Sequence, residues 1–462
     1  MSTDTTIDIM TAHGRLTRLL DEGSFEVIDT EGVVTGRGLI DERPVYVYAQ
    51  EPSVNAGAMT EDMAKKICKV MDMSLDEGVP LISLNECAGA HIKEGTRSLA
   101  GFADVFRRNV QASGVVPQIS VIYGPCAGGA VYSPALTDFT VMLKDSSYMF
   151  VTGPGVVKSV IGEEVSKEEL GGASVHSFKS GVAHFAVEDE AESIHLIREL
   201  MGFLPSNNRE EPPVGRCSDP PERTEPYLNQ IVPENPRKPY DMYSVIKSIA
   251  DDGYFLEVHR NWARNVIVAL TRMGGAPVGI VASQPKVLAG VLDGDASRKA
   301  ARFVRFCDAF NIPIVTLVDV PGFLCGTQQE YGGVITHGAK LIYAYAEATV
   351  PKVTVVLRKA YGGAYVSMGC KQLGCDVNLA WPSAKIAVMG AESAVEVLHR
   401  SDPEFMEDYN LNICSPHLSL DSGSLDEIIE PSNTRGSIIR ALKQIKNIKT
   451  SIPWKKHDNM PL

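Results

Sequence analysis

Apolar residues recur with the spacing of one helix face in several stretches of the chain. Between residues 60 and 78 they fall at Met63, Ile67, Val70 and neighbouring positions, and Gly78 follows as a stop signal. A spacing of three or four residues places such side chains on one side of a helix. The same pattern predicts further helices over residues 10–23, 98–113 and 435–448.

Short runs rich in β-branched residues lie between these helical stretches. They are bounded by glycine and proline, as buried strands often are. Strands alternating with helices indicate an α/β fold, in which crossover helices cover a largely parallel sheet. The runs predict strands over residues 44–49, 80–84, 118–123, 139–143 and 148–152, and a hairpin between residues 32–38 and 44–49.

The same order of elements occurs a second time. Pro44-Val is repeated as Pro277-Val, and 277 − 44 = 233. The Gly-Gly-Ala run at residues 128–130 returns at residues 362–364, and 362 − 128 = 234. An offset this constant indicates an internal duplication. Further matches at one of these two offsets are Pro80 with Pro313, Gly89 with Gly322 and Pro117 with Pro351.

The duplication predicts two similar domains, residues 1–225 and 226–462. Between them, residues 210–239 are rich in proline, glutamate and arginine and have no periodic apolar pattern. This composition predicts a solvated connector. Residues 454–462 are expected to close the chain as a docked tail.

Composition and charge narrow the class of protein. With 44% hydrophobic and 22% charged residues, the chain can bury a sizeable core. The net charge of −13 argues against nucleic acid as a partner, because phosphate backbones need clustered lysine and arginine. Residues 1–8 have neither the basic nor the apolar region of a secretory signal, and no apolar run is long enough to span a bilayer. We therefore expect a cytoplasmic protein without membrane contact.

The nine cysteines are scattered and show no paired Cys-x-x-Cys spacing. Such a distribution is typical of reduced thiols and gives no metal-ligand pattern. The chain is expected to hold no metal.

The candidate chemistry lies in the repeated glycine run. Gly-Pro-Cys-Ala-Gly-Gly-Ala-Val-Tyr at residues 124–132 follows one β-branched run, and Lys-Ala-Tyr-Gly-Gly-Ala-Tyr at residues 359–365 follows another. Where a strand turns into a helix, main-chain N–H groups are left unpaired, and glycine keeps them open to a ligand. Such groups can stabilise an oxyanion. One copy alone could equally serve tight helix packing, but two equivalent copies favour a site that polarises two carbonyl-like groups together.

Other common catalytic signatures are missing from the sequence. It has no Gly-x-Ser-x-Gly elbow, His-Glu-x-x-His motif, Walker loop or Gly-x-Gly-x-x-Gly turn after a strand. The acidic pairs at 163–164 and 168–169 are interpreted as an exposed face. A base carried by a cofactor or substrate therefore fits the inventory. The histidines interpreted as structural include His91, His176, His184 and His337.

Several longer motifs stand in one order along nearly the whole chain. They cover residues 32–36, 124–138, 148–154, 168–172, 203–208, 318–323, 329–333, 358–365 and 380–384. Together they resemble the carboxyltransferase subunits of biotin-dependent acyl-CoA carboxylases, especially the propionyl-CoA carboxylase β type. The resemblance implies two duplicated crotonase-like (ClpP/crotonase) ββα-superhelix domains. It also implies a homo-hexamer, a trimer of dimers, with sites between the first half of one chain and the second half of another.

The resemblance implies an activity as well. Members of the family transfer a carboxyl group from carboxybiotin to the α-carbon of an acyl-CoA thioester, which gives a substituted malonyl-CoA. In this mechanism a biotin nitrogen removes the α-proton, and carboxybiotin arrives on a biotin carboxylase or biotin carboxyl carrier subunit. The chain has no Ala-Met-Lys-Met biotinylation site and no ATP-binding module, in keeping with a separate partner. The N-terminal domain is expected to be the CoA side and the C-terminal domain the biotin side.

Site residues follow from the matching motifs. One hole, at Gly128 and Gly129, and the other, at Gly363 and Ala364, are expected to bind the thioester oxygen and the biotin ureido oxygen, in an order left open. Val366 stands where propionyl- and acetyl-selective relatives have aspartate, which suggests a longer or branched acyl group. The candidates for CoA binding are Ala127, Lys93, Arg107 and Arg108, and a solvated charged face is the alternative for the last three.

The sequence departs from the family near the CoA side. Residues 25–32 join the first helix directly to the glycine run, where the family has a longer basic loop, and His91 replaces an arginine. Three alternative functions stay open at this point. They are a biotin-dependent acyl-CoA decarboxylase, a biotin-independent crotonase-type acyl-CoA decarboxylase, and a non-enzymatic assembly subunit.

Overall fold

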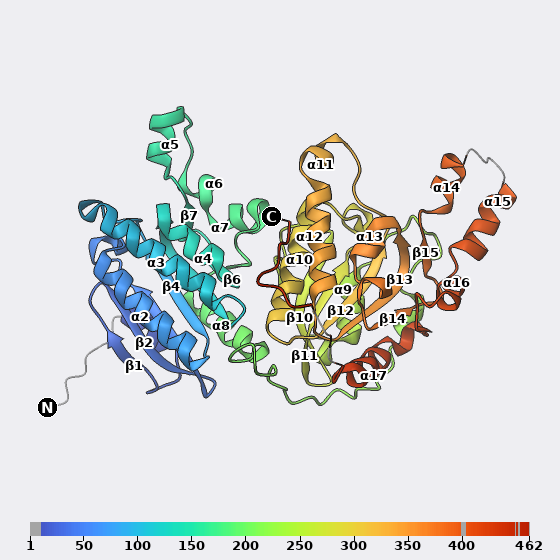
Figure 1. The fold of residues 1–462 in the computed structure, drawn as a ribbon, viewed down its shortest axis with the longest axis horizontal. Helices are drawn as coiled ribbons and strands as arrows, with labels where there is room; N and C mark the ends of the chain where they lie inside the picture. Colours follow the sequence, from blue (N-terminus) through green and yellow to red (C-terminus); the bar gives the residue numbers. More distant parts are fainter. Residues whose placement is uncertain (1–10, 399–402, 449, 451–452, 462) are drawn as a thin grey trace. The chain divides into compact units, whose positions relative to one another are not determined.

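The computed structural model describes residues 11–398, 403–448, 450 and 453–461. The chain forms two compact units, Met1–Glu211 and Pro212–Leu462 (Figure 1). The division falls 225 − 211 = 14 residues before the boundary expected from composition. The N-terminal segment 1–8 and the first residue of the helix expected over 10–23 lie outside the described residues.

One mixed sheet organises the first unit. Its strands follow the order β1-β2-β3-β4-β5-β6-β8, and β7 pairs with β5. The pairs from β1 to β3 are antiparallel, and those from β3 to β8 are parallel. The strands are β1 (Glu26–Asp29), β2 (Val33–Ile40), β3 (Arg43–Gln50), β4 (Leu81–Cys87), β5 (Gln118–Ala127), β6 (Phe139–Leu143), β7 (Tyr148–Phe150) and β8 (Phe185–Val187). The predicted hairpin is thus confirmed as β2 and β3.

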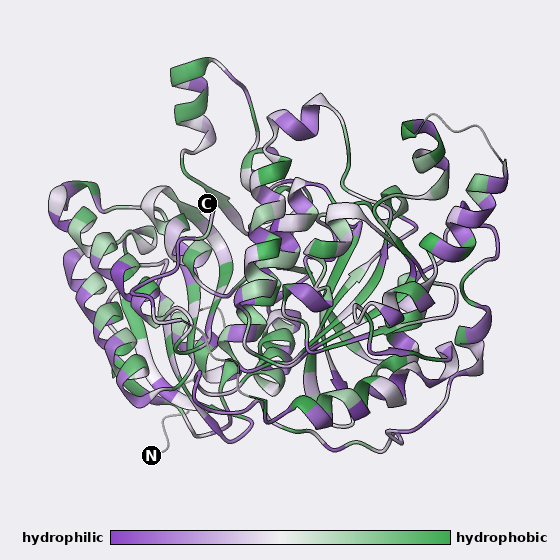
Figure 2. Cartoon of the chain, turned by 45° about the vertical axis from the view of Figure 1, so that its right-hand side comes forward, coloured by the Kyte–Doolittle hydropathy of each residue, from purple (hydrophilic) through white to green (hydrophobic). Residues whose placement is uncertain are grey.

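Helix α2 shows why the sequence pattern was sufficient for the helices. The Thr60 hydroxyl accepts a hydrogen bond from the Met63 N–H at 3.1 Å, and Gly78 ends the helix in the left-handed conformation. Its apolar face enters the core of the unit, so purple and green alternate along the helices in Figure 2. The helices of the unit are α1 (Ala12–Leu19), α2 (Glu61–Glu77), α3 (Thr96–Ala112), α4 (Tyr132–Leu136), α5 (Pro154–Ile161), α6 (Lys167–Gly171), α7 (Ala173–Val175) and α8 (Glu190–Phe203).

The second unit repeats the sheet of the first. Its order is β9-β10-β11-β12-β13-β14-β16, and β15 pairs with β13 as β7 does with β5. The pairs from β9 to β11 are antiparallel and those from β11 to β16 parallel. This confirms the duplication predicted from the constant offset. The strands are β9 (Phe255–Val258), β10 (Val266–Met273), β11 (Ala276–Ser283), β12 (Ile314–Val320), β13 (Lys352–Tyr361), β14 (Val377–Ala380), β15 (Lys385–Ala387) and β16 (Glu427–Ile428).

The segment between the predicted domains is only partly solvated. Leu228 and Ile231, around the short helix Pro226–Gln230, are buried in the core of the second unit, and Tyr240 is buried there too. The expectation of a solvated connector was therefore wrong for this part. Its apolar residues are too widely spaced for a periodic pattern, yet Leu228 and Ile231 pack against the core.

Helices of the second unit cover its sheet, and the end of the chain lies against two of them. Arg305 on α10 forms an ion pair with Asp458 at 2.8 Å, and Lys455 pairs with Glu347 at the end of α12. The expected docked tail is confirmed for its described residues.

Among the described residues no helix is long and apolar enough to cross a membrane. The helices of the second unit are α9 (Met242–Ile249), α10 (Gly294–Ala309), α11 (Thr327–Tyr331), α12 (Val334–Glu347), α13 (Gly362–Ser367), α14 (Ala391–Val397), α15 (Pro403–Asp408), α16 (Pro416–Asp421) and α17 (Thr434–Ile445).

Candidate functional site

The first glycine turn lies where β5 ends. Gly128 has a φ of +61°, which turns the chain from the strand into the short helical segment Gly128–Val131 and then α4. Glycine reaches this conformation without strain. The side chain of Ala127, which precedes the helix, makes no capping hydrogen bond. The first N–H groups of the turn, including that of Gly129, therefore have no acceptor within the helix.

The second glycine turn has the same geometry. β13 ends at Tyr361, Gly362 has a φ of +58°, and α13 begins without a capping side chain. At the offset of 234, Gly128 corresponds to Gly362 and Gly129 to Gly363. The two turns are thus copies of one device that leaves N–H groups unpaired at the end of a buried strand.

The equivalence bears on the residues expected for the two holes. The sequence prediction names Gly128 and Gly129 in one half and Gly363 and Ala364 in the other. At the offset of 234, the second pair is shifted by one residue relative to the first. Gly129 and Gly363 are the equivalent pair. The Ala364 methyl group is fully buried, so the residue also fixes the turn to the core.

A second loop lies beside the first turn. Met59 donates its N–H to the Gly89 carbonyl at 2.8 Å, and His91 donates its N–H to the Met59 carbonyl at 2.9 Å. In a parallel pairing of this kind, the N–H of the residue between, Ala90, points to the opposite side. A Cβ at Gly89 would lie 3.1 Å from the Ala127 carbonyl oxygen, so this loop is in contact with the turn.

The second turn has the equivalent loop after β12. Leu292 donates its N–H to the Gly322 carbonyl at 3.0 Å and accepts from the Leu324 N–H at 2.7 Å, which leaves the Phe323 N–H pointing away. Within the described parts of the chain, neither the Ala90 nor the Phe323 N–H has a recorded acceptor. Sequence reasoning missed both donors, although the match of Gly89 with Gly322 marked their loops.

A pocket surrounds the second turn. It has a volume of about 920 Å³. Its wall includes Gly362 and Gly363 of the turn itself and Gly322 and Phe323 of the loop after β12. Tyr361 lines it as well, and burial raises the pKa of the Tyr361 hydroxyl, which therefore stays protonated. The turn is thus open to a ligand of substantial size. The charged residues of the wall are Glu234, Arg237, Arg358, Lys359, Lys385 and Glu392.

A buried carboxylate holds the strand that carries the second turn. The pairing of β12 with β13 shifts between Val318 and Val320, and Asp319 lies at this irregularity, fully buried. Asp319 accepts hydrogen bonds from Arg358 at 3.0 Å and 2.9 Å and from the Lys359 N–H at 3.1 Å. The residues that follow leave β14 and pair with β15 instead. Asp319 therefore fixes the bend through which β13 reaches the pocket.

The first unit has a carboxylate at the equivalent place. Glu86 lies where the pairing of β4 with β5 shifts, and it accepts a hydrogen bond from Arg15 of α1 at 2.9 Å. Arg15 stacks on the Tyr123 ring at 4.7 Å, much as Arg358 stacks on Tyr240 at 5.0 Å. A Cβ at Gly124 would lie 2.4 Å from a Glu86 carboxylate oxygen, so a side chain at this position would displace the Glu86 side chain.

The residues expected to bind CoA lie in different surroundings. Ala127 is the last residue of β5, next to the first turn. Lys93 is exposed in the loop that follows Ala90, and Arg107 is exposed on α3. The structure therefore brings Ala127 to the turn and leaves the other two cations on the surface.

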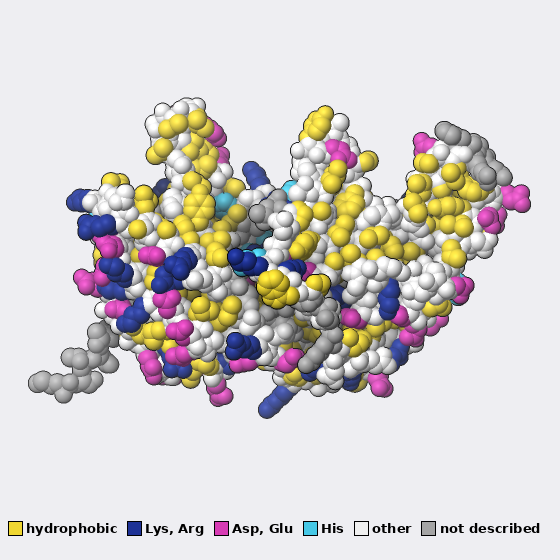
Figure 3. Space-filling view, viewed as in Figure 1, with side chains coloured by type: hydrophobic (Ala, Val, Ile, Leu, Met, Phe, Trp, Pro, Cys, Tyr) yellow, Lys and Arg dark blue, Asp and Glu magenta, His cyan; other side chains and the backbone are white. Residues whose placement is uncertain are grey.

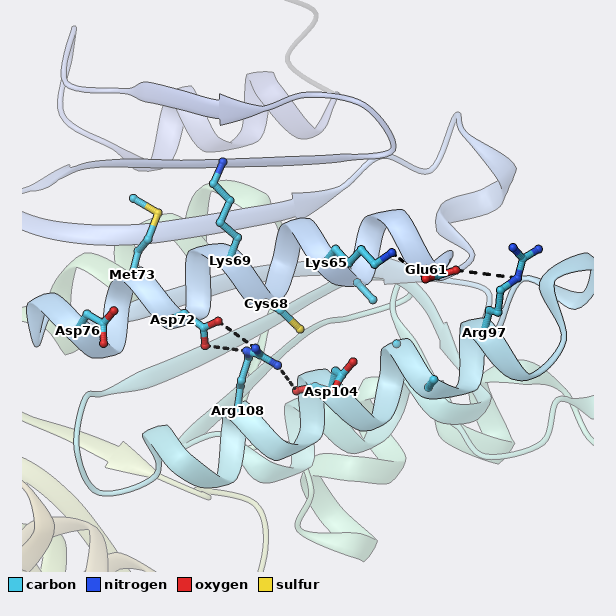
Figure 4. Close-up of a pocket in the computed structure, with 13 residues that line it drawn as sticks. Glu61, Lys65, Cys68, Lys69, Asp72, Met73, Asp76, Arg97, Asp104 and Arg108 are labelled. Carbon is cyan, nitrogen blue, oxygen red and sulfur yellow. Dashed lines mark hydrogen bonds and ion pairs between the residues drawn. The ribbon is translucent and has the colours of Figure 1, made fainter.

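Arg108 lies in a groove between α2 and α3. The groove has a volume of about 540 Å³, and some of its charged side chains pair with one another (Figure 4). Arg108 binds both oxygens of Asp72, at 2.7 Å and 3.0 Å, and Lys65 pairs with Glu61 at 2.7 Å. The positive charge of Arg108 is thus already neutralised within the chain.

Val366 lies on α13, and its side chain is 40% exposed. It follows Gly362 and Gly363 in the same helix, but it is not among the residues that line the pocket of the second turn.

Comparison with known proteins gives a consistent result. The family described as carboxyl transferase domain matches residues 16–460. A propionyl-CoA carboxylase beta chain of Roseobacter denitrificans is 55% identical over 98% of this chain and 94% of its own length. The mitochondrial propionyl-CoA carboxylase beta chain of Homo sapiens is 51% identical over 98% of this chain and 88% of its own length.

Solved structures show the same fold. The transcarboxylase 12S hexamer with hydrolysed methylmalonyl-coenzyme A bound is 47% identical, has a TM-score of 0.95 and matches 98% of this chain and 93% of its own. A single-chain, multi-domain long-chain acyl-CoA carboxylase, 24% identical with a TM-score of 0.78, matches 93% of this chain and 47% of its own. The crotonase-like fold expected for both halves agrees with these likenesses.

The buried pair of Asp319 and Arg358 yields a prediction about stability. Replacing Asp319 by asparagine leaves the Arg358 guanidinium buried without its counter-charge. Removal of one partner from such a pair costs about 3–5 kcal/mol. We expect Asp319→Asn to lower the urea midpoint of unfolding, followed by circular dichroism, by the amount that corresponds to this loss.

Glu392→Gln is the matched control for this prediction. Glu392 pairs with Arg237 at 3.0 Å, but both side chains are largely exposed. Exposed pairs contribute little to stability, so the midpoint should hardly change. Equal midpoints for the two variants would show that Asp319 does not hold the bend.

Proposed function

The chain belongs to the carboxyl transferase family and is an acyl-CoA carboxyltransferase, and we propose that carboxybiotin is its carboxyl donor and propionyl-CoA its acceptor. The names of the relatives support propionyl-CoA, since relatives that are 51–55% identical to this chain are propionyl-CoA carboxylase chains. Their support outweighs the expectation of a larger acyl group from Val366 alone. The product would be methylmalonyl-CoA.

The observation that carries the proposal is the open pocket around the second glycine turn. Its volume of about 920 Å³ and its free N–H groups suit a planar ring with a carbonyl-type oxygen, which describes the ureido ring of biotin. We therefore assign biotin to the second unit, where Gly363, Ala364 and Phe323 would donate to that oxygen. The bound group supplies the carboxyl group and the basic nitrogen that removes the α-proton.

The first turn is assigned to the acyl-CoA. Loss of the α-proton places negative charge on the thioester oxygen, and the N–H groups of Gly128, Gly129 and Ala90 are the donors proposed for it. Preorganised N–H donors act where charge develops, so they need not reorganise during the reaction. Ala127 would lie beside the bound thioester.

Exposed apolar surface supports an assembly of several copies. Figure 3 shows apolar side chains gathered on the segments that contain α5, α11 and α14. Helix α5 has no buried residue, and Val160 and Ile161 are exposed by 73% and 67%. Apolar surface of this kind marks an interface, and the transcarboxylase relative is a hexamer. We propose a homo-hexamer that receives carboxybiotin from a separate biotin carboxylase or carrier subunit.

Gly363→Val tests the second turn directly. A Cβ at Gly363 would meet only the Phe323 ring, at 3.9 Å, so the new side chain begins without a clash, and its methyl groups would block access from the pocket to the N–H groups. We expect kcat for carboxyl transfer from methylmalonyl-CoA to free biotin to fall about a hundredfold. Gly436→Ala on α17 is the control, since its Cβ finds no atom closer than 3.8 Å. Unchanged transfer, or transfer without biotin, would contradict the proposal.

Val366→Asp tests the acyl preference. We expect the wild-type protein to carboxylate propionyl-CoA with a higher kcat/KM than acetyl- or butyryl-CoA. A charged side chain in place of the valine methyl groups should lower kcat/KM for butyryl-CoA more than for propionyl-CoA, by about tenfold, because one methylene contributes ~1–3 kcal/mol to discrimination. The same ratio of the two rates in both proteins would remove Val366 from the specificity site.

A further inference from the structure

Most cations in the wall of the second-turn pocket are already paired. The pocket has four of them, and three make ion pairs or hydrogen bonds with other residues of the unit. Their charges are therefore offset or held in place before any ligand arrives. The three contacts are Arg358 with Asp319 at 2.9 Å, Arg237 with Glu392 at 3.0 Å, and Lys385 with the Asn410 carbonyl oxygen at 2.9 Å.

Lys359 is the fourth cation, and it differs from the others. No hydrogen bond or ion pair of its ammonium group is recorded within the described residues. It lies two residues before Tyr361 on β13, so both side chains point to the same face of the strand, and both line the pocket. Its main-chain N–H is fixed by Asp319 at 3.1 Å. The side chain thus leaves a rigid backbone and enters the pocket.

The surroundings of Lys359 make an anion a favourable neighbour. Burial, and next to it the Arg358 guanidinium, lower the pKa of the half-buried Lys359 ammonium, and Asp319 and Glu392 oppose this only in part. A charged group that is partly removed from water without a partner is costly. A negatively charged ligand in the pocket would remove this cost.

The strand that leads to the first turn has no cation at the equivalent positions. At the offset of 234, Lys359 corresponds to Pro125, since 359 − 234 = 125, and Arg358 corresponds to Gly124. Both residues are uncharged. Both units therefore have the glycine turn, but of these equivalent positions only those of the second unit carry a positive charge, which points to a ligand that is itself an anion.

We propose that Lys359 binds the carboxylate that the donor carries into the pocket of the second turn. This inference rests on the proposed function, in which the donor is carboxylated biotin. The ammonium donates charge-assisted hydrogen bonds to the carboxylate, while the turn holds the ring oxygen. Lys359 thereby distinguishes the carboxylated donor from the uncarboxylated ring.

Lys359→Met tests the assignment through two Michaelis constants. The variant should raise KM for free carboxybiotin about ten- to hundredfold, because a hydrogen bond to a charged group is lost. KM for uncarboxylated biotin, measured in the reverse direction from methylmalonyl-CoA, should stay the same. Lys359→Arg keeps the charge and should restore most of the affinity.

The control is Lys371→Met, whose ammonium pairs with Asp426 outside the pocket. It should change neither constant. If Lys359→Met raises both constants equally, the residue only shapes the pocket, and the proposal is overturned. The proposal also fails if neither constant moves.

A second measurement uses the unmodified protein and needs neither biotin nor acyl-CoA. Lysines are acetylated with an N-hydroxysuccinimide ester and mapped by mass spectrometry, with sodium bicarbonate replacing sodium chloride at equal ionic strength. Bound bicarbonate should slow acetylation of Lys359 in a saturable way and leave Lys371 unaffected. Acetylation of Lys359 that is insensitive to bicarbonate counts against the site.

The two measurements separate the inference from the proposed function. Protection of Lys359 together with absence of carboxyl transfer to any acyl-CoA would support the anion site and reject the donor. Transfer with no protection and no change in KM would leave the function standing and reject the role of Lys359.

Discussion

A buried carboxylate at the bend of a central parallel strand is the interaction on which the second glycine turn depends. Without the bend, β13 would continue beside β14, and its last residues could not pair with β15. An irregularity in a ladder leaves a main-chain N–H without its partner strand. Asp319 accepts that N–H from Lys359 and the guanidinium of Arg358 with one carboxylate. The position of the turn is thus set inside the core, where no solvent competes.

The first unit solves the same problem with other side chains. Glu86 takes the place of Asp319, and its arginine comes from α1 instead of from the bent strand. Since Arg15 replaces the strand arginine, position 124 can be glycine, which gives room for the longer glutamate. Position 125 is proline, which has no N–H to satisfy. The constraint has therefore been kept through the duplication, although almost none of the residues that meet it are the same.

This explains which parts were predictable from the sequence. Helix α2 was predictable because Thr60 caps its start and Gly78 ends it. The two turns were predictable because only glycine reaches the φ of Gly128 and Gly362 without strain. The Ala90 and Phe323 donors could not be predicted from residue types, because the donor is a main-chain N–H group and side chains as different as those of alanine and phenylalanine can accompany it. The burial of Leu228 was hidden for a related reason, since a single apolar residue among prolines has no period.

The difference in charge between the two turns follows from what each is proposed to hold. A thioester oxygen is neutral in the bound acyl-CoA and gains charge only as the α-proton leaves. Oriented N–H dipoles suit this oxygen, because they act on the charge that develops in the transition state. A permanent cation at the first turn would instead stabilise other anions that are already charged when they bind. A carboxylated ring carries its full charge before the reaction. A lysine, whose compact ammonium ends a flexible chain, suits such a ligand better than an arginine already engaged in a planar pair. In the second unit Arg358 pairs with Asp319 and so stabilises the bend of β13, whereas Lys359 remains available for the proposed ligand. Two adjacent residues of one strand thus have different roles, one structural and one in ligand binding.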